Sequence, residues 1–225
     1  MGCPGFRKNN LPATYEKMTP QSGTRLMLEE IKSKYGFNSP RVFKAMSAVP
    51  RSSFVSPKRR HYAYRDMALP ISHGQTISQP YTVAFMTHLL KLKGNERVLE
   101  LGTGSGYQAA VLSHLAREVY SIERLRPLAQ KAKARLLSLN YKNVHVKWGR
   151  GELGWPAKAP FDAIIITAQI QGEIPKVLKD QLKDGGIIVA PVNETMLRLT
   201  KKVNKFKTES FGSFRFVPFV KASPH

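Results

Sequence analysis

One short segment in the middle of the chain constrains the fold more than any other part of the sequence. Val98-Leu-Glu-Leu101 has the character of a buried strand, Gly102-Thr-Gly-Ser-Gly106 follows it directly, and a helical pattern begins at Tyr107. Glycines permit a tight turn and allow the backbone to come close to a bound group. The order of strand, glycine turn and helix therefore indicates an α/β fold that binds a nucleoside-containing ligand at the turn.

Strand-like and helix-like segments alternate on both sides of this turn. Short apolar runs predict strands at 97–101, 119–122, 144–148, 163–167 and 187–192, and helical patterns lie at 81–92, 107–116, 127–139 and 174–182. Such alternation is typical of a mainly parallel, doubly wound sheet with helices on both faces. Upstream, amphipathic patterns predict two further helices, at 22–35 and 39–49.

The two ends of the chain differ from this core. Strand-like runs at 196–203 and 214–220, joined by a polar stretch, predict a C-terminal antiparallel hairpin within residues 193–221. Residues 1–20 mix Pro, Gly, Asn and Lys without periodicity, which predicts a flexible tail. We therefore expect one domain over 21–225, with a helical part (21–60), a polar loop segment (61–80), a ligand-binding core (81–192) and the hairpin.

The charge of the chain is strongly positive and unevenly spread. Its net charge is +21, and residues 1–60 hold 12 basic and 3 acidic side chains while residues 196–225 hold 7 and 1. Such basic flanks attract nucleic acid, anionic surfaces or acidic polypeptides. A role in solubility is the simpler explanation, because no Arg/Gly-rich tract or aromatic RNA-binding signature accompanies the charge.

Several other classes of protein are disfavoured. No apolar run approaches the ~18 residues of a membrane span, and the first residues lack the apolar region of a secretory signal. The single cysteine, Cys3, provides no disulfide framework, so we expect a cytoplasmic protein. No metal site is expected, because the histidines lack ligand-like spacing; those considered are His73, His88, His114 and His145.

The glycine turn and the strand after it predict which cofactor is bound. Glu123 ends the second strand about 20 residues after the turn, where a carboxylate can accept hydrogen bonds from both ribose hydroxyls. The turn reads G-x-G-x-G and lacks the later glycine that pyrophosphate-binding turns prefer, which favours S-adenosylmethionine over NAD. The residues predicted to bind it are Glu100, Gly102, Thr103, Gly104, Ser105, Gly106 and Glu123, with Arg150 and Gly151 in the segment 148–156 that follows the next strand and is placed to contact the adenine.

A polar, hydroxyl-bearing loop at 69–81 precedes the turn, which suggests an enzyme that holds a second reactant beside the cofactor. With this loop the chain resembles the protein-L-isoaspartate O-methyltransferase family over roughly residues 25–220. The most specific shared motif is Gly74-Gln-Thr-Ile-Ser-Gln-Pro-Tyr81. The other shared segments are Ala63-Tyr64, Asp66, 69–71, 98–111, 119–124, 154–156, 162–165, 181–183, 185–186 and 216–218.

The resemblance implies a class I S-adenosylmethionine-dependent methyltransferase fold, Rossmann-like, with 61–80 as the substrate loop. It implies methyl transfer to the α-carboxyl of L-isoaspartyl residues in damaged proteins and peptides, which starts repair through a methyl ester and a succinimide. By the same resemblance Ser78 is the active-site residue. Thr76 and Ile77 would line the pocket, with His73 and Asp66 as neighbours on the substrate side.

The residue inventory agrees with that chemistry. A carboxylate acceptor is already ionised at neutral pH, since its reference pKa is only ~3.9, so no strong general base is needed. Methyl transfer from a sulfonium to a carboxylate removes two opposite charges, so a closed pocket and in-line placement should do most of the work. Ser78 precedes Pro80 and a helical pattern, so helix capping is a second possible role for it.

Two departures from the family pattern keep alternatives open. Arg150 stands where the family usually has an Asp credited with binding the adenine amine, and an arginine cannot accept that hydrogen bond, a loss of about 1–3 kcal/mol. The loop at 168–172 also lacks the family's alanine-rich sequence followed by Pro. A paralogue that methylates another carboxylate or a nucleic acid is therefore the main alternative, and a binding or scaffold protein without activity is the second.

Overall fold

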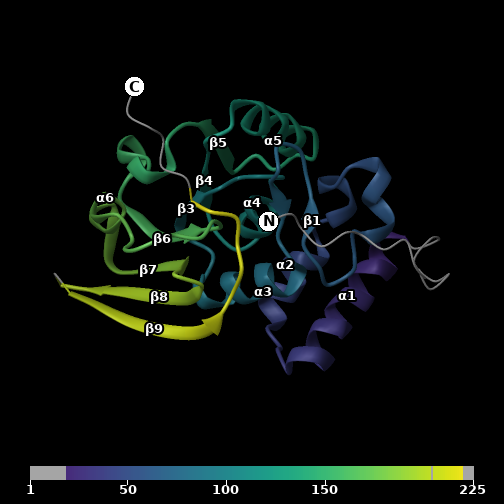
Figure 1. Cartoon of the computed structure of the whole chain (residues 1–225), viewed down its shortest axis with the longest axis horizontal. Coiled ribbons are helices and arrows are strands. Elements are labelled where there is room, and N and C mark those ends of the chain that lie inside the picture. Colours follow the sequence, from purple (N-terminus) through teal and green to yellow (C-terminus); the bar gives the residue numbers. More distant parts are fainter. Residues whose placement is uncertain (1–18, 204, 220–225) are drawn as a thin grey trace.

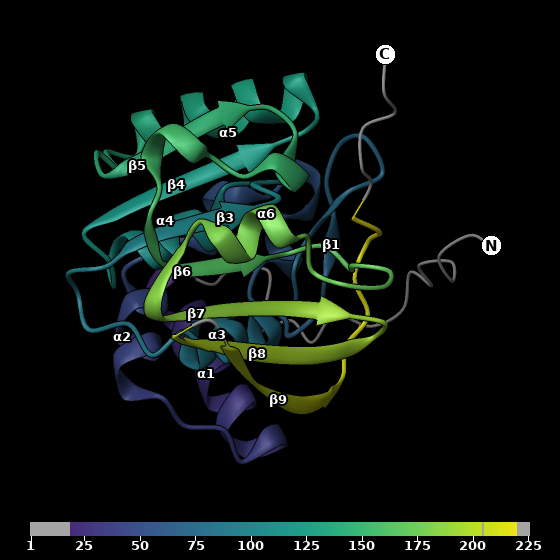
Figure 2. The ribbon, with the colours of Figure 1, turned by 90° about the vertical axis from the view of Figure 1, so that its left-hand side faces the viewer.

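The computed structural model describes residues 19–203 and 205–219, with a seven-stranded sheet at its centre (Figure 1). The strand order is β5-β4-β3-β6-β7-β8-β9, and Figure 2 shows the strands stacked in this order, from β5 beside α5 down to β8 and β9. The first five strands of this order are parallel, and β8 and β9 are antiparallel. The strands are β3 (Arg97–Leu101), β4 (Glu118–Glu123), β5 (Val144–Trp148), β6 (Phe161–Ile166), β7 (Leu182–Val192), β8 (Thr195–Lys202) and β9 (Lys205–Ser213).

Helices and a small second sheet complete the structure. The α-helices are α1 (Pro20–Tyr35), α2 (Pro40–Ser47), α3 (Pro80–Leu89), α4 (Tyr107–Ser113), α5 (Arg126–Ser138) and α6 (Lys176–Asp180). The 3₁₀ helices are η2 (Arg51–Phe54), η3 (Pro57–Tyr62), η4 (Gly151–Leu153) and η5 (Pro156–Lys158), and β1 (Leu69–Pro70) pairs antiparallel with β2 (Thr76–Ile77). None of the helices in the described part of the chain is both long and apolar enough to cross a membrane.

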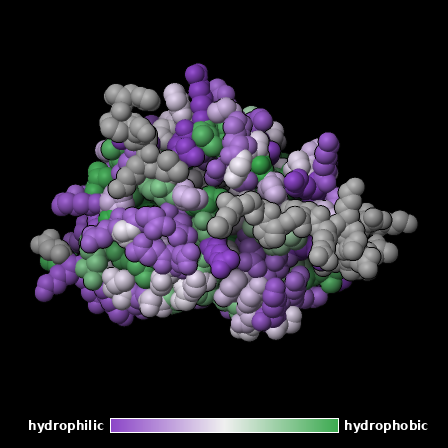
Figure 3. Space-filling model, in the orientation of Figure 1, coloured by the Kyte–Doolittle hydropathy of each residue, from purple (hydrophilic) through white to green (hydrophobic). Residues whose placement is uncertain are grey.

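Two apolar clusters cover opposite faces of the sheet. Side chains alternate between faces along a strand, so Val98 belongs to the first cluster and Leu99 to the second. Helices α1 to α5 contribute to the first cluster and α6 to the second. On the face drawn in Figure 3, hydrophilic residues predominate, as expected when apolar side chains are used in these two layers.

The predicted parallel core is confirmed, although the boundaries of several helices and strands are shifted. Helix α6 covers only 176–180 of the predicted 174–182, because Pro175 precedes it and β7 already begins at Leu182, five residues before the predicted strand. The helix predicted at 39–49 ends at Ser47. The tail predicted for residues 1–20 lies almost entirely outside the described residues, and the division of the chain into one domain stays a prediction.

The C-terminal hairpin is confirmed, but its predicted second strand is wrong. The partner of β8 is β9, at 205–213, and not 214–220. Arg198 of β8 lies opposite Glu209 of β9 and donates from Nε and Nη2 to its carboxylate at 3.0 and 2.8 Å. Pro218 has no N–H for a strand ladder, and residues 214–219 leave the sheet. The polar residues of β9 suit the exposed edge of a sheet, which is why the sequence pattern did not predict it.

Candidate active site

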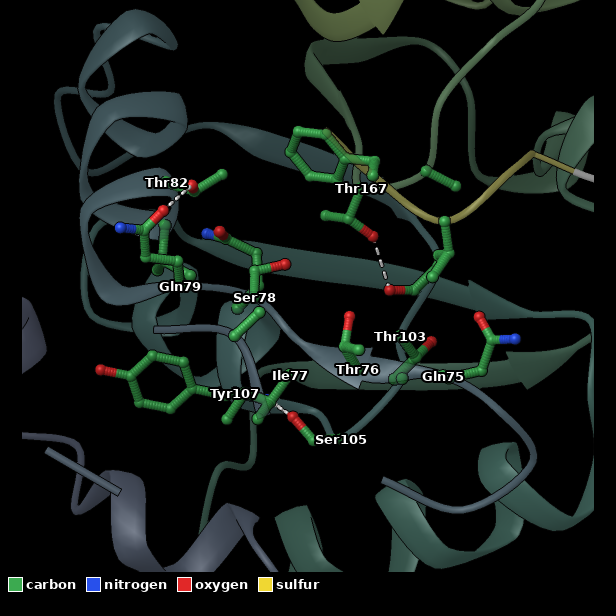
Figure 4. A pocket seen from close by; sticks show the side chains of 18 of the residues that line it. Gln75, Thr76, Ile77, Ser78, Gln79, Thr82, Thr103, Ser105, Tyr107 and Thr167 are labelled. Atoms are coloured by element: carbon green, nitrogen blue, oxygen red, sulfur yellow. Dashed lines mark hydrogen bonds between the residues drawn. The ribbon is translucent and has the colours of Figure 1, made fainter. Parts of the chain in front are cut away.

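A cavity of about 560 Å³ lies where the parallel strands β3, β4 and β6 end (Figure 4). Open α/β sheets bind ligands at this edge, outside the carboxyl ends of their strands. Residues from the whole length of the chain line the cavity: Asp66–Ala68, Gln75–Gln79, Thr82, Val83, Gly102–Ser105, Tyr107, Gln108, Ile122–Arg124, Gly151, Thr167, Ala168 and Arg215–Phe219. The glycine turn and the 76–78 loop, which the sequence suggested as site segments, thus line one common cavity.

The glycine turn is shaped by close packing as well as by backbone conformation. Gly102 has φ +99°, and a Cβ on it would lie 2.5 Å from Oγ1 of Thr167. That hydroxyl donates to the carbonyls of Leu101 and Gly102, so the end of β6 fixes the turn. Gly104, at φ +53°, also lines the cavity, whereas a Cβ on Gly106 would meet Leu136 of α5 at 3.3 Å. Two glycines thus form cavity surface, and Gly106 instead permits helix packing.

Glu123 presents a fixed carboxylate at the end of β4. It is 5% exposed and lines the cavity. Its Oε2 accepts from the backbone N–H of Gly104 and its Oε1 from that of Leu125, both at 2.9 Å. Each carboxylate oxygen can accept more than one hydrogen bond, so the group remains able to bind hydroxyls of a ligand. These hydrogen bonds fix the position of the carboxylate relative to the glycine turn.

Glu100 does not line the cavity, although it was predicted to bind the cofactor. It is fully buried below the turn, where its Oε2 accepts from the Ser121 hydroxyl, which in turn hydrogen-bonds the Thr103 hydroxyl. Its Oε1 has no hydrogen-bond partner among the described residues. Burial raises the pKa of Glu100 to about 8, and the nearby Glu123 adds to this rise. Glu100 therefore supports Thr103 from inside the fold and is held protonated at neutral pH.

The 76–78 segment forms the opposite wall. Figure 4 shows the hydroxyl groups of Thr76, Ser78 and Thr167 turned toward the same open space. No described residue hydrogen-bonds the Ser78 hydroxyl, while its carbonyl accepts from Nη2 of Arg51 at 2.8 Å. Ile77 is buried and pairs with Leu69 in the small sheet. Ser78 is thus held by its backbone and has a side chain available to a ligand.

Asp66 lies at this wall but uses its carboxylate for structure. Its Oδ1 accepts from the backbone N–H of Tyr81 at 2.8 Å, at the start of α3. Its Oδ2 accepts from Tyr35 of α1 at 2.7 Å and from Gln79 at 2.8 Å. The helix-capping role considered for Ser78 is therefore filled by Asp66. His73 is exposed, adopts φ +61° and is not part of the cavity wall.

Residues 215–219 form a further wall of the cavity. This role was not predicted from the sequence, because the segment was assigned to the hairpin. The backbone of Gln169 binds this segment on either side of Pro218. Its N–H donates to the carbonyl of Val217 at 2.8 Å, and its carbonyl accepts from the N–H of Phe219 at 2.7 Å. Phe219 packs against Gly151, where a Cβ would lie 3.4 Å from its ring. The match of 216–218 to the family motif was the one sequence signal for this placement.

Comparison with known proteins decides the family. A family model described as protein-L-isoaspartate(D-aspartate) O-methyltransferase (PCMT) matches residues 22–224. The chain belongs to this methyltransferase family. A protein-L-isoaspartate O-methyltransferase from Dictyoglomus thermophilum is 50% identical over 198 residues, which cover 86% of this chain and 90% of the relative. The doubly wound sheet is therefore the class I methyltransferase fold that the sequence predicted.

Two solved structures are similar to this chain over most of its length. One, described as a protein-L-isoaspartate O-methyltransferase, is 28% identical with a TM-score of 0.77; the match covers 89% of this chain and 65% of the longer solved chain. Another, from Plasmodium falciparum, is described as a beta-aspartate methyltransferase (PCMT) in complex with S-adenosyl-L-homocysteine. It is 22% identical with a TM-score of 0.78, covering 88% and 99% of the two chains, and it supports the fold alone.

The two departures from the family pattern have definite positions in the structure. Arg150 is not part of the cavity wall; its side chain is 48% exposed and its Nε donates to Glu152 at 2.8 Å, while Gly151 does line the cavity. The altered 168–172 loop is fixed to β7, since Ile170 donates to the carbonyl of Pro191 at 2.9 Å. Only Ala168 of that loop lines the cavity.

The cavity combines exposed backbone with a carboxylate. Gly102 and Gly104 line it at the turn, and the Glu123 carboxylate lies beside them in the same wall. The volume is in the range of small-molecule sites. Among the described residues there is no cluster of three His, Cys, Asp or Glu side chains that could hold a metal ion.

Proposed function

We propose that this protein transfers a methyl group from S-adenosylmethionine to the α-carboxyl of L-isoaspartyl residues in damaged proteins. One observation carries the proposal: a single cavity joins the glycine turn and Glu123 to the Thr76-Ile-Ser78 wall. Membership of the isoaspartyl methyltransferase family supports the substrate class. Membership of this family also supports S-adenosylmethionine as the cofactor.

The cofactor side of the reaction rests on four residues. Gly102 and Gly104 provide close backbone approach, Glu123 accepts from the ribose hydroxyls, and Gly151 forms the wall beside the adenine. When bound, S-adenosylmethionine supplies an electrophilic methyl group on a sulfonium. The protein's task is then to orient this group toward the acceptor and to exclude water.

The acceptor side rests on the 76–78 wall. The Ser78 hydroxyl donates to one oxygen of the isoaspartyl α-carboxylate and leaves the other oxygen to attack. Arg51 fixes the backbone of Ser78, so the hydroxyl is positioned before the substrate binds. Arg215 and Arg124 line the cavity and attract an anionic acceptor. Phe216 and Pro218 cover the reacting groups, which keeps the pocket dry.

Three finer points belong to this proposal. Damaged proteins and peptides are the partners, and methylation starts repair because the ester formed on the α-carboxyl can be displaced to give a succinimide. A cytoplasmic location is expected, and the single cysteine is consistent with it. Contact with nucleic acid or acidic partners through the basic flanks is a further expectation; residues 1–18 of the first flank lie outside the described part.

The test is a methyl-transfer assay with radiolabelled S-adenosylmethionine. Three acceptors are compared: an L-isoaspartyl peptide, its aspartyl twin and bulk RNA. Label on the isoaspartyl peptide alone, released as methanol in base, is the expected result. A protein that binds S-adenosylhomocysteine but leaves that peptide unlabelled would contradict the proposed acceptor, and label on RNA would support the nucleic-acid alternative.

A further inference from the structure

A second cavity, of about 630 Å³, lies beside the glycine turn. It is bounded by residues 53–60 on one side and by α5 on the other, with Ile71 and Ser72 between them. Gly104 and Ser105 belong to the walls of both cavities, so the turn separates the two. The proposed methyl transfer uses no other residue of this second cavity.

Among the described residues, every titratable group that lines the second cavity is cationic. These groups are Arg60, Lys131 and Arg135, and none of the described carboxylates lines it. None of the three takes part in an ion pair with a described residue. The described residues therefore leave the positive charge at this position uncompensated, whereas Arg198 and Lys183 elsewhere in the fold each pair with a carboxylate.

Arg135 is the best-positioned of these cations. It is half-buried, and its Nη1 donates to the carbonyl of Ser105 at 2.8 Å, which orients the guanidinium in the wall of the cavity. Its other N–H groups have no acceptor among the described residues. Burial lowers the pKa of Arg135 from its ordinary value, as expected for a partly desolvated cation that lacks an anion.

Hydroxyl and apolar groups complete the lining. The hydroxyls of Ser53, Ser56 and Ser72 form no hydrogen bond with a described residue, so three donors are available near the cations. Phe54, Val55, Leu128 and Leu139 provide apolar wall. Guanidinium, ammonium and hydroxyl donors together suit a tetrahedral oxyanion, and the apolar wall suits an organic group attached to it.

We propose that this second cavity binds a small organic phosphate monoester. The phosphate lies between Arg60, Lys131 and Arg135, and the organic group packs against Phe54 and Leu128. The cavity volume exceeds that of inorganic phosphate alone and lies in the range of small-molecule sites. The site is separate from the methyl-transfer site, because Glu123 and Ser78 line only the first cavity.

Calorimetric titration of cytidine monophosphate into the full-length protein tests the site. The protein is first saturated with S-adenosylhomocysteine, so that the first cavity is filled and cannot receive the nucleotide. Saturable binding of the monophosphate is expected, with cytidine and inorganic phosphate each binding about tenfold more weakly or worse, since each keeps only half of the contacts.

Two matched variants locate the binding. In the Arg60→Gln/Lys131→Gln double variant the affinity should fall about tenfold or more, because two charge-assisted contacts are lost. Lys133→Gln is the control, since Lys133 is exposed on the same helix and does not line the cavity. Circular dichroism establishes that both variants are folded.

Four results would overturn the proposal. The first is an absence of saturable binding at millimolar nucleotide. The second is equal weakening by the Lys133→Gln control, and the third is much tighter binding of an RNA oligonucleotide with the same loss in all variants; either would indicate a diffuse charge effect. The fourth is binding that occurs only without S-adenosylhomocysteine, which would assign the nucleotide to the first cavity. None of these results depends on which acceptor the enzyme methylates.

Discussion

Ser78 shows how little a methyl-transfer site requires from a single side chain. Its hydroxyl faces the cavity without a partner among the described residues, and its backbone is held by Arg51. No described side chain that could act as a base hydrogen-bonds this hydroxyl. A carboxylate acceptor needs no base, because it is ionised before it binds. The chemical demand on Ser78 is therefore to orient an anion and not to activate a nucleophile.

Replacing Ser78 with alanine should thus lower activity without unfolding the protein. Ser78→Ala is expected to reduce kcat/KM for an isoaspartyl peptide about 10- to 100-fold, the usual contribution of a hydrogen bond to a charged group. The affinity for S-adenosylhomocysteine and the thermal midpoint should stay unchanged. Steady-state kinetics and calorimetry measure these quantities, with Ser33→Ala on the exposed face of α1 as control. Full activity of Ser78→Ala would remove the hydroxyl from the mechanism.

Arg150 has the opposite character, since its position outside the cavity wall does not support the cofactor contact predicted for it. Its guanidinium pairs with Glu152 outside the cavity. We expect Arg150→Ala to change the dissociation constant of S-adenosylhomocysteine by less than about twofold, whereas Glu123→Gln should raise it about tenfold or more by weakening the ribose contacts. Isothermal titration measures both. A large loss of affinity in Arg150→Ala would place this side chain against the adenine.

At the scale of elements, Arg51 joins η2, the 63–78 segment and α4. It is fully buried, donates to the carbonyls of Ala63 and Ser78 at 2.8 Å each, and stacks on the Tyr107 ring with 4.8 Å between the guanidinium carbon and the ring centroid. Burial lowers its pKa to about 10, which leaves it charged at neutral pH. One side chain therefore ties the acceptor wall to the start of the helix that follows the glycine turn.

Loss of this connection should destabilise the protein. Arg51→Met removes the donors of two buried carbonyls, and each unsatisfied carbonyl costs about 1–3 kcal/mol, so we expect the free energy of unfolding to fall by about 2–4 kcal/mol. Arg51→Lys keeps the charge but has a single donor group, and should be intermediate. Urea unfolding measures the change, with the exposed Arg60→Met as control. An unfolding midpoint equal to the wild type in Arg51→Met would show that these hydrogen bonds contribute nothing net.

Elements differ in how far their sequence predicts them. The central parallel strands β3, β4 and β6 are buried on both faces, so their apolar runs stand out, as in Ala163–Ile166. Edge strand β9 has no such run, and its position depends on the pairing of Glu209 with Arg198 across the hairpin. The role of Arg51 was not predicted, because the carbonyl groups that it binds are 12 to 27 residues away in sequence. Contacts of that kind become visible only when the chain is folded.

At the scale of the whole molecule, the active site depends on the complete fold. Its walls come from segments near residues 66, 78, 104, 123, 151, 167 and 217. The family motifs predicted those that lie in sequence next to a strand end or in the 74–81 loop. The wall at 215–219 is held at the cavity by the backbone of Gln169, which hydrogen-bonds Val217 and Phe219. Glu100 is buried below the glycine turn and is connected to Thr103 of that turn through the Ser121 hydroxyl. Its protonation state should therefore affect the stability of the whole fold.

The protonation of Glu100 should make the stability of the molecule decrease as pH rises. Burial raises its pKa from an ordinary value of 4.5 to about 8. Below pH 4.5 the Glu100 carboxyl is protonated in both the folded and the unfolded chain, so its ionisation does not reduce the free energy of unfolding. Between these two values only the unfolded chain releases the proton, so the free energy of unfolding falls, by about 1.4 kcal/mol per pH unit at most.

Glu100→Gln isolates this contribution, because an amide stays neutral throughout and has nearly the same shape. The fall in stability between pH 5 and pH 8, measured by urea unfolding, should be smaller in Glu100→Gln than in the wild type, whereas Glu29→Gln on exposed α1 should keep the wild-type slope. Other groups titrate equally in all three proteins, so the difference between slopes reports Glu100 alone. Identical slopes in Glu100→Gln and the wild type would mean that the folded protein binds the Glu100 proton no more tightly than the unfolded chain does.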